Sequence, residues 1–306
     1  MTATTSSTQR DSVSSMMPDL PVSVIVPVFN HWDLVPELLA CLQAQTLDKH
    51  SFEVLLVDNG SDALPSDLQL PHWARLMHCP TPGSYAARNA AVAEARGDTL
   101  VFTDADCRPV PEWLESGIAC IEATTHGAII AGDIVIEPRD RSNVTSYELY
   151  DMALGMPQRR YVSHGYAVTA NLFVPSRIMR RSGGFDPTRF SGGDAEFCRR
   201  MVATGAGLQF CPRAVTRHPA RREWGELATK ARRIKGGQIT AGPRFRRLSY
   251  VFRTLMPPFR VWGMALRAER LSVSQRMTVC AIKARLWRVE MAEMLRLVLG
   301  KPPNRS

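Results

Sequence analysis

Short runs of branched aliphatic residues alternate with helix-like segments through about the first 140 residues of the chain. Residues 22–29 (VSVIVPVF) and 52–58 (FEVLLVD) have the apolar, β-branched composition of strands that are buried on both faces. Residues 33–45 lie between them and repeat leucine every four residues, which is typical of one helix face. This alternation predicts βαβ units, and therefore an α/β fold with a mostly parallel sheet and helices on both of its faces.

The same pattern continues along the chain and loosens after about residue 140. We expect further strands at residues 75–80, 99–106, 127–137, 167–175 and 207–212. We expect further helices at residues 85–96, 111–123, 176–186 and 192–205. The remaining residues are basic and helical in pattern, with a break at the two prolines at 257–258.

Polar side chains follow three of the expected strands at the point where each strand ends. Asn30 follows the first strand, Asp58 ends the second, and Asp104 and Asp106 end the fourth. Ligands of parallel α/β sheets bind beyond the carboxyl ends of the strands, so we predict a binding site at this edge. Asp104 and Asp106 would face one side if the strand continues through them, and a cation would then relieve their repulsion. Taken alone, the pair is equally compatible with two solvated turn residues.

The positive charge of the chain is concentrated at its C-terminal end. Residues 1–212 hold 16 Lys and Arg against 24 Asp and Glu, a net charge of −8, whereas residues 213–306 hold 22 against 5, a net charge of +17. Such asymmetry predicts an anionic partner. An apolar stripe on a helix is expected at residues 273, 277, 280, 284, 287, 291, 294 and 298. Three interpretations stay open: docking on the preceding domain or on a second copy, binding to an anionic membrane surface, and nucleic-acid binding, which no recognition motif supports.

The N-terminal residues and the cysteines bear on the compartment. Residues 1–20 are polar, lack the apolar core of a signal peptide and are expected to form a disordered leader. No run of 18 apolar residues predicts a membrane-spanning helix. The seven cysteines include no C-x-x-C pair, and their odd number and irregular spacing favour buried thiols over a disulfide framework or a zinc site. These features favour a cytoplasmic protein, with the basic region allowing a peripheral position on the cytoplasmic face of the inner membrane.

A set of motifs in a fixed order resembles one enzyme family. The motifs are VSVIVPVFN, VLLVDNGSD, GSYAARNAA, TDADC, GGFD and GGDAEFCRRMVATG, which together cover roughly residues 22–218. They resemble the inverting family 2 glycosyltransferases of the GT-A fold. The resemblance implies a catalytic domain at 21–219, with a donor half at about 21–137 and an acceptor half at about 138–219, followed by a basic helical region at 220–306.

The resemblance also implies where a nucleoside-diphosphate sugar donor binds. It places Pro27, Phe29 and Asn30 at the donor, assigns Asp58 to the base, and assigns Asp104 to the ribose or the sugar. The motif GSYAARNAA puts a helix N-terminus beside Arg88, and such N-termini attract phosphates. The simpler alternatives are a turn-forming aspartate at Asp58 and a surface arginine at Arg88.

Within the same resemblance, Asp106 binds a divalent cation, Mg²⁺ or Mn²⁺, which stabilises the departing nucleoside diphosphate. His218 stands where many relatives carry a histidine after the last strand, and it is a candidate further metal ligand or diphosphate contact, although a structural role is an open alternative. Trp113 is equally compatible with lining the sugar site and with core packing. Asp186 of GGFD is expected to be structural.

Asp194 is the candidate general base for the acceptor hydroxyl. The family pattern usually places a glutamate before this aspartate, whereas Gly193 stands there in this chain. Glu196 is a possible substitute or rival, and Asp194 is also a possible N-cap of the helix that follows. The sequence therefore predicts transfer of a sugar to a hydroxyl of a glycan or lipid-linked acceptor, in cell-surface polysaccharide or glycolipid synthesis.

Two other functions and an assembly state stay open. A nucleotidyltransferase on a related sheet is disfavoured because no glycine-rich loop with a lysine follows the first strand. A degenerate, non-catalytic nucleotide-sugar-binding protein is kept open by Gly193. A homo-oligomer is possible, and nucleic acid is an improbable partner.

Overall fold

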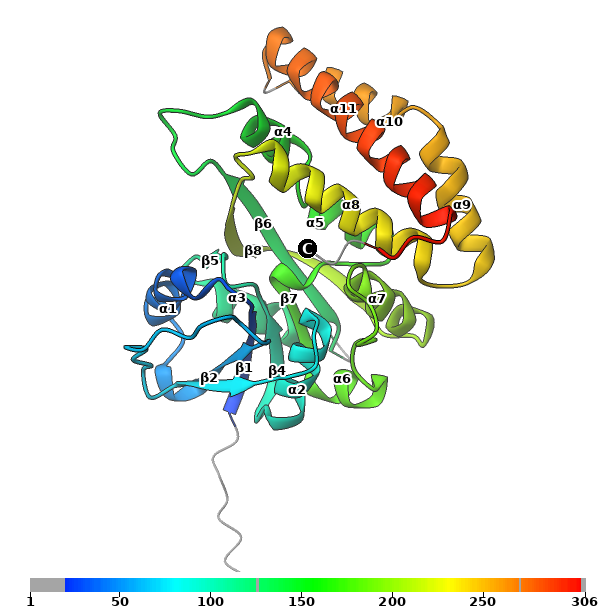
Figure 1. Ribbon diagram of the computed structural model, residues 1–306. Helices are drawn as coiled ribbons and strands as arrows, with labels where there is room; N and C mark the ends of the chain where they lie inside the picture. Colours follow the sequence, from blue (N-terminus) through cyan, green and yellow to red (C-terminus); the bar gives the residue numbers. More distant parts are fainter. Residues whose placement is uncertain (1–19, 125–126, 270, 304–306) are drawn as a thin grey trace, which may run out of the picture.

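The computed structural model describes residues 20–124, 127–269 and 271–303, so the expected leader at 1–20 lies outside the described residues except for its last position. Its strands are β1 (Leu20–Val28), β2 (Phe52–Asp58), β3 (Ala74–His78), β4 (Gly97–Phe102), β5 (Arg108–Pro109), β6 (Ile129–Glu137), β7 (Leu172–Pro175) and β8 (Leu208–Pro219). Its helices are α1 (Val35–Gln43), α2 (Ser84–Glu94), α3 (Trp113–Glu122), α4 (Ser146–Leu154), α5 (Gln158–Val162), α6 (Ser176–Ser182), α7 (Gly193–Ala203), α8 (Trp224–Thr240), α9 (Arg244–Leu255), α10 (Phe259–Leu266) and α11 (Val273–Val298). Figure 1 shows their arrangement.

The strands form one sheet in the order β3-β2-β1-β4-β7-β6-β8-β5. β1 pairs in parallel with β2 and β4, and β2 pairs in parallel with β3. β7 is antiparallel to β4 and β6, β6 is parallel to β8, and the short β5 is antiparallel to β8. The predicted α/β fold with a mostly parallel sheet is confirmed. The carboxyl ends of β1, β2 and β4 therefore lie at one edge of the sheet, where ligands of such folds bind.

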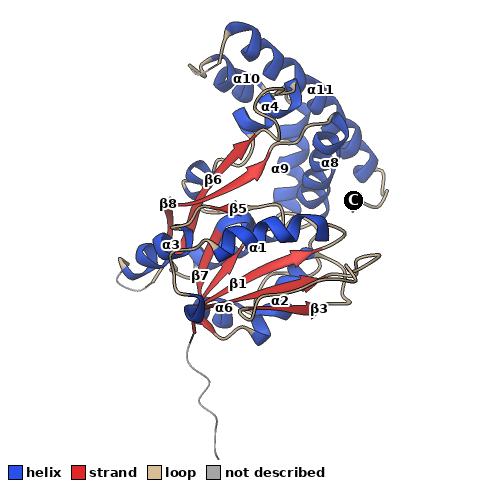
Figure 2. Cartoon of the chain, turned by 90° about the vertical axis from the view of Figure 1, so that its left-hand side faces the viewer, coloured by secondary structure: helices blue, strands red, loops and turns tan. Residues whose placement is uncertain are grey.

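Helices cover both faces because the central strands are apolar on both sides. Val24 and Val26 of β1 pack in one core cluster with α1 and α3, whereas Ile25 belongs to a second cluster with α2, α6 and α7. Successive side chains of a strand point to opposite faces, so one buried strand contributes to both clusters. In Figure 2 the sheet lies between α1 and α2.

Several boundaries differ from the sequence expectation at the edge that matters for function. β4 ends at Phe102, and the amide of Cys107 donates to the carbonyl of Asp104 at 3.0 Å, which closes a turn. The expectation that the strand continues through Asp106 is therefore wrong. β8 is longer than expected and carries His218, because it pairs along most of β6 past a bulge between Gly132 and Asp133. Helices α4 and α5 were not expected from the sequence.

The basic C-terminal region folds into α8, α9, α10 and α11, which gather on one side of the molecule (Figure 1). α11 packs on α8 through Leu227, Ile282 and Leu286, with side chains of α4 beside them. A second small cluster joins α8, α9 and α11. The docking interpretation of this helix is thus the one that the structure shows. No helix among the described residues has the length and apolar character needed to cross a membrane.

The face that α11 buries is not the predicted stripe. Its buried residues are Val279, Ile282, Leu286, Glu293, Met294 and Leu297. Of the predicted set, Met294 is buried, whereas Val273, Met277 and Val298 are more than half exposed. The helix carries apolar residues over much of its circumference, so spacing alone did not identify the face that meets α8 and α4.

The cysteine prediction is partly confirmed. Cys79, Cys107 and Cys198 are buried free thiols. Cys120 of α3 and Cys211 of β8 instead form a disulfide, so the expectation of thiols is wrong for this pair. The two residues are 91 positions apart, and their pairing depends on α3 packing against β8, which the spacing of cysteines does not reveal.

Candidate active site

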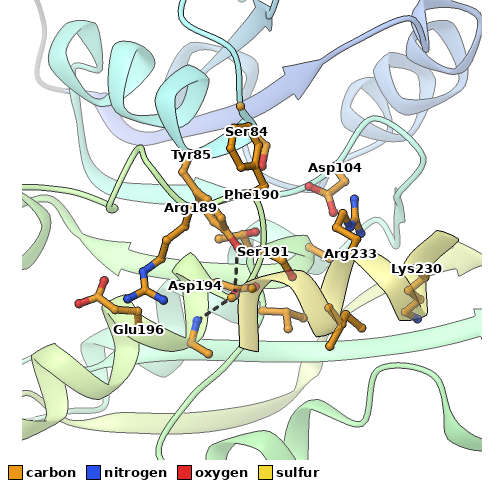
Figure 3. Close-up of a pocket in the computed structure, with 18 of the residues that line it drawn as sticks. Ser84, Tyr85, Asp104, Arg189, Phe190, Ser191, Asp194, Glu196, Lys230 and Arg233 are labelled. Atoms are coloured by element: carbon orange, nitrogen blue, oxygen red, sulfur yellow. Dashed lines mark hydrogen bonds between the residues drawn. The ribbon is translucent and has the colours of Figure 1, made fainter. Parts of the chain in front are cut away.

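A cavity of about 1180 Å³ lies at the carboxyl edge of the sheet. Its wall combines the end of β1, the start of α2, the turn after β4, and the facing sides of α7, α8 and α9. Asp104, Asp106, Asp194 and His218 all line it, and so does Arg88. The structure therefore brings the predicted metal, donor and base residues to one cavity, as the topology predicts. Figure 3 shows Asp104 and Asp194 on different parts of this wall.

Arg88 and Asp104 form the donor side of this wall. Arg88 lies one turn inside α2, is 3 % exposed, and its Nη2 meets Asp104 Oδ1 at 2.5 Å. Its Nε is buried and has no hydrogen-bond partner among the described residues. Gly83 is the N-cap of α2 and lines the cavity, so the unpaired backbone amides in the first turn of this helix also border the cavity. The surface-arginine alternative for Arg88 is wrong, since the side chain is buried and paired.

Asp106 and His218 meet directly on the same wall. His218 Nε2 lies 3.2 Å from Asp106 Oδ2, and its Nδ1 donates to the carbonyl of Pro219 at 2.8 Å. Burial alone would raise the pKa of Asp106, but the hydrogen bond and charge of His218 outweigh it and lower the pKa to about 2. Burial would lower the pKa of His218, but the hydrogen bond that its Nε2 donates to the Asp106 carboxylate reverses this, so the pKa of His218 is raised. The two groups stabilise each other as an ion pair.

The side chains of Asp106 and His218 suit a divalent cation that the substrate would also help to bind. Among the described residues, no three His, Cys, Asp or Glu side chains converge as a full ligand set. Asp106 and His218 supply one oxygen and one nitrogen, with Asp104 in the same cavity. Mg²⁺ is commonly held by one or two carboxylates, water and substrate phosphates, and Mn²⁺ accepts both oxygen and nitrogen ligands. The residues fit such an ion once His218 has lost its proton, because a protonated imidazole cannot coordinate.

Asp194 lies in the first turn of α7, on the cavity wall. Tyr85 donates from its Oη to Asp194 Oδ1 at 3.2 Å, and the amide of Ala195 donates to the same oxygen at 2.8 Å. Burial raises the pKa of Asp194, and these hydrogen bonds together with the charge of Arg88 only partly offset it. A carboxylate with a raised pKa is a stronger base. The N-cap alternative is wrong, since Gly192 is the N-cap and makes no side-chain cap.

The structure explains why glycine precedes Asp194. A Cβ at Gly193 would lie 2.7 to 2.9 Å from three ring atoms of Tyr85. Tyr85 is 6 % exposed and packs against Phe185, so its ring has little room to move. Glu196, the rival base, also lines the cavity but is paired with Arg200 at 2.7 Å. Gly193 therefore leaves space for the tyrosine that positions Asp194.

The remaining predicted donor residues divide into two groups. Pro27 and Phe29 line the cavity, and Phe29 is 56 % exposed. Asn30 and Asp58 are not part of the cavity wall. Asp58 is buried and accepts from Trp32 Nε1 at 3.2 Å and from the amides of Gly60 and Ser61, as the turn-forming alternative predicts. Its role in base recognition stays a prediction.

Asn30, Trp113 and Asp186 have clear structural roles. Asn30 adopts a φ of 56° and exchanges hydrogen bonds with Asp62. Trp113 is fully buried and donates to Asn171 Oδ1 at 2.9 Å, so it is a core residue. Asp186 accepts from the amide of Thr188 and is structural, as expected.

Sequence reasoning missed the side chains that surround Asp194. Tyr85 lies three residues before Arg88 in α2, which puts both on one helix face, and this spacing was available as a signal. No comparable signal marks the arginines and the lysine that α7, α8, α9 and the loop before α8 contribute. They are Arg199, Arg200, Arg221, Lys230, Arg233 and Arg246.

Comparison with known proteins agrees with this geometry. Residues 23–189 match the model of the family described as glycosyl transferase family 2. The chain is 35 % identical over 225 residues to "Glycosyltransferase AglE" of Haloferax volcanii, covering 71 % of this chain and 73 % of that protein. It is 32 % identical over 225 residues to "Pre-mycofactocin glycosyltransferase" of Mycobacterium tuberculosis, covering 69 % of this chain and 45 % of that protein.

A solved structure shows the same fold. The mannosyltransferase PcManGT from Pyrobaculum calidifontis, in complex with GDP-Man and Mn²⁺, superimposes with a TM-score of 0.59 at 18 % identity, over 91 % of this chain and 87 % of that one. The predicted GT-A architecture is confirmed by this likeness. Because the family model matches residues 23–189 and a curated glycosyltransferase is 35 % identical over 71 % of this chain, the chain belongs to glycosyl transferase family 2.

Proposed function

We propose that this transferase moves a sugar from a nucleoside-diphosphate sugar to a hydroxyl of a glycan or lipid-linked acceptor, with inversion at the anomeric carbon. The observation that carries the proposal is the position of Asp194. Its half-buried carboxylate, with a raised pKa, shares one cavity with Asp104 and Asp106 but lies on a different part of the wall. This separation suits a base for the acceptor on one side and a donor site on the other.

The reaction is a single displacement. The acceptor hydroxyl oxygen attacks the anomeric carbon while the bond from that carbon to the diphosphate oxygen breaks. The hydroxyl proton moves to Asp194, and the bonding electrons leave with the nucleoside diphosphate. Tyr85 holds the carboxylate in position through its hydrogen bond. Attack opposite the leaving group inverts the configuration.

The donor's phosphates are assigned to the Arg88 side of the cavity. The partnerless Nε of Arg88 and the amides at the start of α2 are hydrogen-bond donors that suit an anion. Asp104, held by Arg88, is proposed to contact the ribose or the sugar. A divalent cation held by Asp106 and His218, Mg²⁺ or Mn²⁺, would supply positive charge to the departing diphosphate. PcManGT, which was solved with GDP-Man and Mn²⁺, supports this assignment by likeness.

Exposed apolar and basic side chains of the C-terminal helices support a membrane-binding surface as part of this proposal. Large apolar side chains of α9 and of the start of α10 are exposed, among them Phe245 at 75 %, Phe252 at 67 % and Phe259 at 63 %. Arg244, Arg247 and Arg253 of α9 are exposed beside them. An amphipathic helix of this kind lies in the interface of an anionic bilayer. We propose a peripheral position on the cytoplasmic face of the inner membrane and a role in surface polysaccharide or glycolipid synthesis.

Membership in the family makes the chain a glycosyltransferase, which sets aside the nucleotidyltransferase and the non-catalytic alternatives. The catalytic assignment is tested with two variants. Asp194→Asn is expected to retain donor binding and to lose turnover by about 10² to 10⁴. Glu196→Gln is the matched control and is expected to keep most activity, because Glu196 is already paired with Arg200.

The readouts are release of nucleoside diphosphate and the anomeric configuration of the product by NMR. Turnover of Asp194→Asn within tenfold of the wild type would contradict the assigned base. A product that retains the donor's configuration would contradict the single displacement.

A further inference from the structure

The acceptor side of the cavity carries a concentration of positive charge that the proposed reaction does not use. The cationic side chains on the cavity wall are Arg88, Arg189, Arg199, Arg200, Arg221, Lys230, Arg233 and Arg246. Five of these eight side chains are paired with a carboxylate, although two of the five share one. The pairs are Arg88 with Asp104, Arg189 with Asp186, Arg200 with Glu196, and both Arg221 and Lys230 with Asp151.

Arg199, Arg233 and Arg246 differ from these, because none of them has an ion pair with a carboxylate among the described residues. Arg233 extends from α8 toward the part of the wall that holds Asp104 (Figure 3), so we assign it to the donor side. Arg199 of α7 and Arg246 of α9 remain on the acceptor side. The two lie on facing elements of the same cavity.

Aromatic rings hold these two guanidinium groups in place. Arg199 lies over the ring of Tyr166, 4.4 Å from its centroid, and Arg246 lies 6.0 Å from the centroid of Tyr250. Both tyrosines also line the cavity. A ring face attracts a cation but contributes no negative charge, so the site keeps its net positive charge.

The two arginines line one cavity, and their positive charges repel each other. Burial lowers the pKa of Arg199, and the positive charge of Arg246 lowers it further. Like charges gathered in a cavity without a counter-charge are unfavourable unless an anion completes the site. Two guanidinium groups match the geometry of a phosphate, which they bind through several charge-assisted hydrogen bonds.

We propose that Arg199 and Arg246 bind a phosphate group of the acceptor substrate. The inference deepens the proposed function and rests on it, because it takes this side of the cavity as the acceptor side. Arg246 belongs to α9, whose Phe245, Leu248 and Phe252 are exposed on the outside. A phosphate held there lies beside a surface suited to an apolar chain, so the acceptor is a phosphate-containing lipid whose phosphate binds the two arginines while its hydroxyl reaches Asp194.

The test uses farnesyl phosphate as a short lipid phosphate, with farnesol and inorganic phosphate as matched probes. Thermal unfolding of the full chain is followed with each probe, because a ligand stabilises the state that it binds. Farnesyl phosphate is expected to raise the melting temperature of the wild type more than farnesol does. Arg199→Gln and Arg246→Gln are each expected to weaken its binding about tenfold, as the loss of a charge-assisted hydrogen bond implies. Arg189→Gln is the control, since Arg189 lines the same cavity but is paired with Asp186.

The outcomes separate this inference from the proposed function. Equal binding of farnesyl phosphate by wild type, Arg199→Gln and Arg246→Gln overturns it. Equal loss of nucleoside diphosphate binding in both variants overturns it as well, because the arginines would then serve the donor. If inorganic phosphate protects as well as farnesyl phosphate, and the variants lose both, the phosphate site stands and its source is a soluble phosphorylated acceptor. Donor binding that is intact in both variants leaves the proposed function untouched.

Discussion

Adding a side chain at Gly193 should disturb the base directly. The Cβ of Gly193→Ala would lie 2.7 to 2.9 Å from the ring of Tyr85, well inside van der Waals contact. The ring is buried and packed on Phe185 and cannot swing into solvent. Overpacking of this kind costs about 1 to 3 kcal/mol. A displaced ring also weakens the Tyr85 hydrogen bond to Asp194, which contributes about 1 kcal/mol. We therefore expect Gly193→Ala to lower the free energy of unfolding by about 2 to 4 kcal/mol.

The measurement is equilibrium unfolding in urea, with Gly225→Ala as the control. A Cβ at Gly225, in α8, meets nothing within 4 Å, so that variant should be neutral or stabilised by up to about 1 kcal/mol. Tyr85→Leu combined with Gly193→Ala should recover part of the loss, because the ring that clashes is gone. Gly193→Glu, which restores the usual family residue, should be destabilised and less active. A Gly193→Ala variant within about 0.5 kcal/mol of the wild type would refute the steric argument.

Four further predictions concern the base, the donor side and the membrane surface. With rising pH, kcat/KM should increase through an apparent pKa above that of an ordinary aspartate. Tyr85→Phe should raise this apparent pKa further, because the hydrogen bond from Tyr85 lowers the pKa of Asp194. A pH profile that is the same in Tyr85→Phe and the wild type would contradict the assignment. Asp194→Asn should be more stable than the wild type in urea at pH 7 and should lose this advantage at acidic pH. The raised pKa of Asp194 in the folded wild type gives it stability that is present at low pH and lost as pH rises, whereas asparagine does not titrate. Arg88→Met should raise KM for the donor at least tenfold with the fold retained by circular dichroism, and an unchanged KM would remove Arg88 from the donor site. Replacing Phe245, Leu248 and Phe252 by serine should abolish co-sedimentation with phosphatidylglycerol vesicles, whereas serine at the exposed Val273 and Met277 should not; concentration-dependent dimers lost in the triple variant would instead indicate a second copy on this face.

The parts of the fold that the sequence predicts well are those specified by local composition. β1 and β2 follow from continuous β-branched runs, and the start of α2 follows from Gly83 and Ser84. Helix α4 was not predicted from the sequence, although Thr145 and Glu148 form a capping box at its start and this pattern is visible in the sequence. The disulfide and the buried face of α11 depend on which elements pack together, and residue spacing does not determine that.

The candidate site likewise combines residues that the sequence identified with contacts that only the fold reveals. Asp104, Asp106 and His218 were placed in one cavity by motif order and sheet topology, even though the strand that was expected to carry the two aspartates ends earlier, at Phe102. The contact between Tyr85 and Asp194 joins residues 109 positions apart, so only the folded chain reveals it. Arg199 and Arg246 become neighbours through the docking of α9, and the high arginine content of this region concealed which side chains enter the cavity.

The most direct test of the proposed function is whether the wild-type chain binds a sugar nucleotide. Binding is monitored by thermal unfolding across a panel of nucleoside-diphosphate sugars, each with and without Mn²⁺ or Mg²⁺. We expect at least one sugar nucleotide to raise the melting temperature only when the divalent ion is present. Asp106→Asn should lose that shift, and Asp194→Asn should keep it, because Asp106 is assigned to the ion and Asp194 to the acceptor. A panel in which no sugar nucleotide stabilises the chain with either ion would contradict the central claim.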